Sequence, residues 1–214
     1  MEARRSEALY LELVEGDTAS YRRAVLPGRL AAPGVQVASL WRNQCPDRSD
    51  YERTIPEFET LAVYEVGTGF EPPAAQEGVR GHHFRRVDRP AQGSLSGRPT
   101  LGLELVLVSP RTSGGAGALR DWADFLHIRE IASAAVPGLT MITPYEDAAG
   151  GEPRFLHLYE IDTPDAEAAF REMAPLTIAR LKPRGKQAVR DWMGHPELRI
   201  DYVNSFTRIG EFRP

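Results

Sequence analysis

The sequence predicts an α+β fold built from two similar halves, on the basis of its length, its composition and an internal repeat. Its 214 residues suffice for one large domain or two small ones. Apolar residues make up 42% and charged residues 26%, which is typical of globular proteins. Disordered, collagen-like and disulfide-scaffold chains are therefore excluded.

Three short apolar segments occur twice, in the same order, at separations of 92, 104 and 95 residues. The pairs are 10–15 (YLELVE) with 102–107 (GLELVL), 33–37 (PGVQV) with 137–141 (PGLTM), and 61–66 (LAVYEV) with 156–161 (LHLYEI). Similar spacings indicate a duplicated structural unit. We therefore expect two halves, residues 1–89 and 101–214, joined by a linker at 90–100 that is rich in Gly, Ser and Pro.

The first half has the periodicity of four strands and one or two helices. Alternating or β-rich segments predict strands at 9–15, 35–41, 58–66 and 80–88. A helix is expected over 18–31, before the Pro33-Gly34 pair, and a short one near 72–78. The polar stretch 42–57 is expected to be a loop.

The second half repeats that order more clearly. Strands are expected at 101–108, 138–145, 154–161 and 199–209, with helices over 118–135, after 163–165 and within 175–193. Thr163 is the expected N-cap and Pro164 the first helical position. Each half thus reads β-α-β-β-α-β, the ferredoxin-like unit. Helices cover only one face of such a sheet, and a tandem duplication supplies a partner for the other face.

Charge and cysteine content narrow the possible functions. Basic residues number 26 and acidic residues 30, without a basic block, which disfavours nucleic-acid binding. The single cysteine, Cys45, cannot form an intrachain disulfide, and no 18-residue apolar run is present to span a membrane. The start of the chain has no apolar signal-peptide stretch. These features predict a cytoplasmic protein, and the predominance of Arg over Lys is typical of GC-rich bacteria.

One segment of the second half resembles a known family. Residues 120–128 (RDWADFLHI), 136–139 (VPGL) and Tyr145 resemble the signature of EthD-like members of the dimeric α+β-barrel superfamily. Residues 153–165 are similar to the third strand and second helix of that family. Arg129 stands where family members usually have a proline, so the helix need not break after His127.

The resemblance implies a barrel closed by the two ferredoxin-like halves, with a ligand cavity between sheet and helices. The chain would be a monomer with an internal pseudo-dimer, or a homodimer. Relatives include small monooxygenases, isomerases, cyclases and dehydratases that act on aromatic or polyketide-like compounds. Many of them need no metal or organic cofactor, and we expect none here.

His127 is the first candidate catalytic residue. In a straight helix it falls opposite the apolar face, beside Asp124, with which it would pair at the helix surface. It is either a surface histidine or a general acid or base that titrates near neutrality. Arg129 falls within the apolar face, so either the helix distorts there or Arg129 contacts a buried anion or a substrate oxygen.

His157 and Tyr159 are the second candidates, because strand alternation places them on one face. Leu156 and Leu158 share the other face and suit packing against helices, so the polar pair is expected inside the barrel. It is either a hydrogen-bonded interior pair or a catalytic pair that lines the cavity. Tyr64 is the repeat counterpart of Tyr159.

Glu104 lies within an apolar strand and would act as a proton acceptor if it were desolvated, although such residues more often face water. Trp41, Trp122 and Tyr145 are either cavity walls or core residues. His82 and His83 point to opposite strand faces, and no residue cluster has metal-ligand spacing. Residues 113–117 lack the P-loop and dinucleotide patterns and are expected to form a flexible loop.

These observations predict an EthD-like enzyme that acts on an apolar, oxygenated small molecule. It would catalyse proton transfer, in a cyclisation, dehydration or isomerisation, or a cofactor-free oxygenation. The expected catalytic residues are His127, His157, Tyr159 and Asp124, and the expected substrate-binding residues are Arg129, Trp122, Tyr145, Glu104, Tyr64 and Trp41. The alternatives are a non-catalytic binding or carrier domain and, third, a haem-binding relative.

Overall fold

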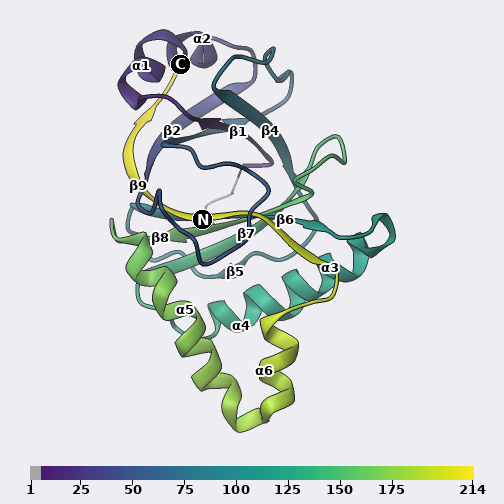
Figure 1. Cartoon of the computed structure of the whole chain (residues 1–214). Coiled ribbons are helices and arrows are strands. Elements are labelled where there is room, and N and C mark those ends of the chain that lie inside the picture. Colours follow the sequence, from purple (N-terminus) through teal and green to yellow (C-terminus); the bar gives the residue numbers. More distant parts are fainter. Residues whose placement is uncertain (1–5) are drawn as a thin grey trace.

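The computed structural model describes residues 6–214, in which antiparallel strands close into a barrel with helices packed outside it (Figure 1). The strands are β1 (Ala8–Val14), β2 (Val35–Asn43), β3 (Thr60–Val66), β4 (Val79–Arg86), β5 (Gln92–Gly93), β6 (Gly102–Pro110), β7 (Leu139–Asp147), β8 (Phe155–Ile161) and β9 (Leu198–Phe212). The α-helices are α1 (Thr18–Ala24), α2 (Leu26–Leu30), α3 (Ala116–Trp122), α4 (Ile128–Ala132), α5 (Ala166–Leu181) and α6 (Lys186–Met193). The short turns η1 (Ser113–Gly115), η2 (Ala123–His127) and η3 (Lys182–Arg184) complete the helical segments.

The strand order explains how the barrel closes. Neighbouring strands run in the order β4-β1-β3-β2-β9-β6-β8-β7, and β4 also pairs with β7. The same relative order, fourth-first-third-second, therefore occurs in each half, and the halves join at β2–β9 and β4–β7. The short strand β5 lies within the predicted linker and pairs with β7.

The two halves differ in their helices. The second half has helices after both its first and its third strand, whereas the first half has only α1 and α2, both before β2. The helix expected near 72–78 is absent, because Pro72 and Pro73 restrict the backbone and residues 67–78 run as turns and extended chain. In Figure 1, α3 to α6 cover the lower side of the barrel, and α1 and α2 lie at its upper end.

The hydrophobic core fills the barrel, and this corrects the predicted orientation of β8. Leu156 and Leu158 point into the barrel, where they pack against Leu103, Leu105 and residues of the first half. His157 and Tyr159 therefore point outward, beneath the helices, and not into the barrel. The predicted alternation along β8 is correct, but the face that was expected inside the barrel lies under the helices, and the other face lies inside the barrel.

The helix that carries His127 departs from the regular geometry assumed for it. Residues 123–127 form a π-helical turn between α3 and α4, which changes the angular position of every later residue relative to the earlier ones. Asp124 and Ile131 face inward as a result, whereas Arg129 is exposed and Phe125 reaches the surface. Arg129 thus does not lie in the apolar face.

The N-cap of α5 is Asp165, two residues after the predicted one. Its carboxylate accepts a hydrogen bond from the amide of Ala168 at 3.0 Å, which is the ordinary capping contact at a helix start. Thr163 and Pro164 precede the helix. None of the helices in residues 6–214 is long and apolar enough to cross a membrane.

Candidate functional site

A cavity of about 420 Å³ lies between the outer face of the second half's sheet and the helices that cover it. Strands β6, β8 and β9 form its floor, and α3 to α6 with η2 form its roof. Most of its lining is apolar, including Val106, Ile131, Met173 and Val203. The aromatic and polar lining residues are Tyr51, Trp122, His127, His157, Tyr159, Phe170, Arg171 and Trp192.

His127 faces this cavity from the π-helical turn, with its ring between two indoles. The ring lies parallel to Trp192, at 5.4 Å between centroids and 8° between planes, and 4.8 Å from the Trp122 centroid. Its Nδ1 lies 2.9 Å from the backbone carbonyl oxygen of Trp192, and the Trp192 indole donates back to the carbonyl of His127 at 3.2 Å. The contacts fix the ring orientation between α6 and η2.

Burial determines the protonation state of His127. Desolvation lowers its pKa to about 4, although the carbonyl of Trp192 opposes this by favouring the protonated form. The imidazole is therefore neutral at pH 7. Because a carbonyl can only accept, Nδ1 carries the hydrogen, and Nε2 retains a lone pair that no hydrogen bond within residues 6–214 uses.

The low pKa of His127 predicts a loss of stability in mildly acidic solution. The folded imidazole has a pKa of about 4, whereas the unfolded one titrates near the usual value of 6.5. Between these values only the unfolded chain binds the proton, so the free energy of unfolding decreases as pH falls, by at most about 3 kcal/mol. In urea unfolding across this range, His127→Gln is expected to lack this part of the pH dependence. Equal slopes for both proteins would contradict the assignment.

Asp124 pairs with His157, not with His127 as the straight helix predicted. His157 Nε2 lies 3.0 Å from Asp124 Oδ1, and Asp124 is only 1% exposed. The second carboxylate oxygen, Oδ2, is buried and has no hydrogen-bond partner among the described residues. The π-helical turn directs Asp124 inward over β8, so the pair joins the helical roof of the cavity to its floor.

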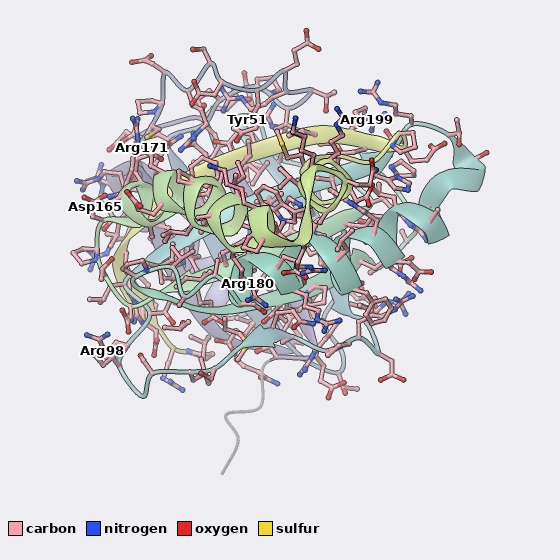
Figure 2. The ribbon with its side chains drawn as sticks, turned by 90° about the horizontal axis from the view of Figure 1, so that it is seen from below. Tyr51, Arg98, Asp165, Arg171, Arg180 and Arg199 are labelled. Carbon is pink, nitrogen blue, oxygen red and sulfur yellow. The ribbon has the colours of Figure 1, made fainter. Side chains whose placement is uncertain are left out.

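Two tyrosines border the cavity near the start of α5. Tyr159 follows His157 on the same face of β8, and burial, reinforced by the nearby Glu104, raises its pKa well above the usual range. Tyr51 comes from the loop between β2 and β3 and packs edge-on against Phe170 of α5, at 6.3 Å between centroids. Figure 2 shows Tyr51 and Arg171 on one side of the helical layer and Arg180 on the other.

The structure separates the remaining predicted binding residues from the cavity. Trp41 and Tyr145 point into the barrel core, and Tyr64 packs beneath α1 in the first half with Tyr21. Arg129 is exposed. Glu104 is fully buried, on the same sheet face as Tyr159, and does not line the cavity. Of the six predicted binding residues, only Trp122 lies in the wall of this cavity, whereas Trp41 and Tyr145 line a second cavity of about 310 Å³ at one end of the barrel.

Sequence reasoning missed Trp192, Tyr51 and Phe170. Trp192 lies on the apolar side of the short amphipathic helix α6, so its burial could be read from the sequence, but its contact with His127 could not. Tyr51 lies in a polar, turn-rich stretch that has no periodic pattern. The cavity wall thus includes residues from α5, from α6 and from the loop between β2 and β3, in addition to those on the strands.

The described residues offer no ready-made metal site, since no group of three His, Cys, Asp or Glu side chains among them could hold an ion. The cavity instead combines an apolar, aromatic lining with a neutral imidazole whose lone pair is free. Such a site suits a flat apolar molecule that gives up a proton to a nitrogen base.

No protein-family model matches this sequence, and no curated protein matches it. Solved structures do match it. An anthrone oxidase-like protein is 16% identical with a TM-score of 0.56, covering 99% of this chain and 95% of its own. A chlorite dismutase variant from Candidatus Nitrospira defluvii is 8% identical with a TM-score of 0.51, covering 97% and 93%. A major regulator of staphylococcal pathogenesis is 10% identical with a TM-score of 0.51, covering 94% and 99%.

At these identities the likenesses show the fold alone. The chain shares an α+β barrel fold with these structures, over nearly the whole length of each. The fold does not fix the reaction, because one barrel can carry many different sites.

Proposed function

We propose that this protein is an EthD-like enzyme that takes a proton from an apolar, oxygenated small molecule of the aromatic or polyketide-like class. The neutral His127 carries this proposal: its Nε2 lone pair is free, and its ring is held between Trp122 and Trp192 in an apolar cavity. The low pKa makes His127 a weak base, so the substrate must carry an acidic proton, as a phenol or a methylene beside a carbonyl does.

The other cavity residues have supporting roles in this proposal. Flat substrates would pack against the aromatic lining, and the Tyr159 hydroxyl would donate a hydrogen bond to the substrate oxygen. The buried pair of Asp124 and His157 holds the roof and floor of the cavity in register. After the proton leaves, the substrate carbanion can rearrange, eliminate water or react with dioxygen.

Anthrone is a suitable probe, because one similar structure is named anthrone oxidase-like and because anthrone has acidic methylene hydrogens beside aromatic rings. Without dioxygen, in deuterium oxide, we expect the protein to accelerate exchange of these hydrogens at least about a hundredfold over buffer. In air, oxidation would consume one dioxygen and release one water for each anthraquinone formed. If the protein accelerates the exchange but not the oxidation, the reaction that it catalyses is a proton transfer and not an oxygenation.

The carrier hypothesis makes a different prediction for the same experiment. A carrier would bind anthrone, seen as quenching of the fluorescence of Trp122 and Trp192, without accelerating either exchange or oxidation. A protein that binds the probe but accelerates neither reaction would favour the carrier over the enzyme for this class of ligand.

A haem fits the described cavity poorly. Iron bound to Nε2 of His127 would bring the porphyrin against two neighbouring indoles, that of Trp192, which stacks on the imidazole, and that of Trp122, which is tilted against it. In His157, Nε2 is occupied by Asp124, and only Nδ1, the nitrogen nearer the backbone, is left. The proposed chemistry therefore does not involve haem.

The strand order supports the proposed tandem origin of the barrel. Both halves have the fourth-first-third-second order of a ferredoxin-like sheet, and they meet through equivalent edge strands. In this proposal the two halves form an internal pseudo-dimer, and the protein is a monomer or a homodimer in the bacterial cytoplasm. The first half has lost its second helix, so only the second half keeps a roofed cavity.

A further inference from the structure

One serine hydroxyl lies between two carboxylates beside the cavity. Ser205 Oγ, on β9, is 2.6 Å from Glu104 Oε2 and 2.7 Å from Glu167 Oε2. Arg48 Nη2 also donates to this oxygen at 3.2 Å. A hydroxyl has one proton to donate and two lone pairs to accept with. Ser205 therefore cannot donate to both carboxylates.

The arrangement is satisfied if one carboxylate is protonated. Glu104 Oε2–H then donates to Ser205 Oγ, and Ser205 donates its own proton to Glu167. Glu104 is the better holder of the extra proton because it is 0% exposed and pairs with no cation among the residues that the structure describes. Burial raises its pKa to about 8, although Ser205 and Arg48 act in the opposite direction. Glu167 pairs directly with Arg48 and with Arg171, which favours its ionised form.

Arg48 connects this network to the loop that carries Tyr51. We name residues 44–57 the strap. Arg48 has a side chain that is 1% exposed, donates to Asn204 Oδ1 at 3.1 Å and lies over the Phe170 ring at 4.4 Å. Gln44, the first residue of the strap, accepts from the amides of Ala166 and Glu167 at the start of α5. The strap is thus fastened to α5 and β9 at the edge of the cavity.

We infer that Glu104 and Glu167 hold a single proton between them through Ser205, and that this proton keeps the strap closed against α5 with Tyr51 in the cavity wall. With the proton present, the buried charges of Arg48 and Glu167 balance. If Glu104 also ionises, two carboxylates face one buried cation, and one of them loses the serine hydrogen bond. Moving the strap outward then allows water to reach Glu104.

The other charged and titratable groups around the network are near its outer side. On the strap these are Cys45, which hydrogen-bonds to Glu167, Asp50, 3.9 Å from Arg48, and Tyr51. Arg53 and Glu57, also on the strap, pair with each other and contact the Arg48 carbonyl and the Asn204 amide. On α5 the group is Arg171, and on β8 it is Tyr159. Asp50 and Arg171 are largely exposed, so solvent screens them, and the ionisation of Glu104 remains the main change in buried charge between pH 5 and 8.

The shared proton can be observed without any ligand. In the infrared spectrum at pH 7, we expect a protonated-carboxyl band that disappears in Glu104→Gln and titrates out near pH 8 in the wild type. Glu167→Gln should move that titration about one pH unit lower, because it removes the second carboxylate and frees Arg48 to face Glu104. Glu12→Gln is the matched control. Glu12 is the repeat counterpart of Glu104 but pairs directly with Arg29 at 2.8 Å, so the band should persist.

Cys45 reports on the strap, since it is the chain's only cysteine and lies on this loop. The rate of its reaction with a pyridyl disulfide is compared between the wild type and Glu104→Gln at each pH, which cancels the ionisation of the thiol. Opening releases a proton from Glu104, so the ratio should rise with pH between about 5 and 8, by at most about tenfold per unit, and then level off.

Either of two results would overturn the inference. A protonated-carboxyl band that survives in Glu104→Gln would place the proton elsewhere. A flat ratio of Cys45 reactivity across this pH range would show that the proton does not control the strap. Neither readout uses a substrate, so both are independent of whether the proposed enzymatic reaction occurs.

Discussion

Replacing His127 with alanine is expected to slow hydrogen exchange of anthrone by at least about a hundredfold while its affinity changes only a few-fold. The substitution removes the free Nε2 lone pair but leaves the aromatic lining in place. Because burial lowers the pKa of His127 to about 4, wild-type activity on the acidic side of pH 7 should fall as pH approaches 4. An isolated histidine would lose activity near pH 6–7.

His195→Ala is the matched control for this prediction. Its ring also contacts Trp122, at 5.7 Å between centroids, but it does not line the cavity, so turnover should be unchanged. His157→Ala tests the other candidate histidine. Because His157 Nε2 faces Asp124, this substitution should mainly weaken binding and stability. A full loss of exchange in His157→Ala, with normal exchange in His127→Ala, would assign the base to His157.

Local sequence patterns predicted the strands well because each pattern needs only neighbouring residues. Alternation in 102–107 and 156–161, together with turn residues around them, predicts the ends of β6 and β8 to within two residues. The repeat also anticipated that the two halves would share a strand order. Both predictions depend on patterns that can be recognised in a single sequence, without knowledge of the tertiary contacts.

The face of each strand could not be predicted in the same way. All seven residues of β8 are buried, so its period-two pattern has no exposed side to mark the outside. The sequence places His157 and Tyr159 in the barrel interior only if Leu156 and Leu158 pack against the helices, and the structure has the Leu pair in the barrel instead. Most of the interior is occupied by Leu, Phe and Tyr side chains, with a cavity of about 310 Å³ at one end, and the cavity that His157 and Tyr159 line lies beneath the helices.

The position of His127 depended on one irregular turn. A helical wheel assumes a constant rotation per residue, and residues 123–127 break that assumption. The same turn directs Asp124 to His157. Nothing in the segment itself marks a π-helical turn, so the Trp122–His127–Trp192 stack could only be seen in three dimensions.

Leu156 and Val106 lie on opposite faces of the sheet, so substitutions at these two positions should have different effects on stability and on ligand binding. Leu156 is 0% exposed within the barrel core, so Leu156→Ala leaves a void and should lower the free energy of unfolding by about 2–5 kcal/mol. Val106 borders the cavity, so Val106→Ala enlarges a space that already exists and should cost about 1 kcal/mol or less.

Ligand binding should show the reverse order. Val106→Ala changes the cavity floor and should alter the affinity for anthrone severalfold, whereas Leu156→Ala, measured where it is still folded, should leave that affinity unchanged. Urea unfolding and tryptophan quenching on the same two variants measure both quantities. If Leu156→Ala instead alters binding and Val106→Ala destabilises the chain, ligands bind inside the barrel and His127 is not the residue that meets them.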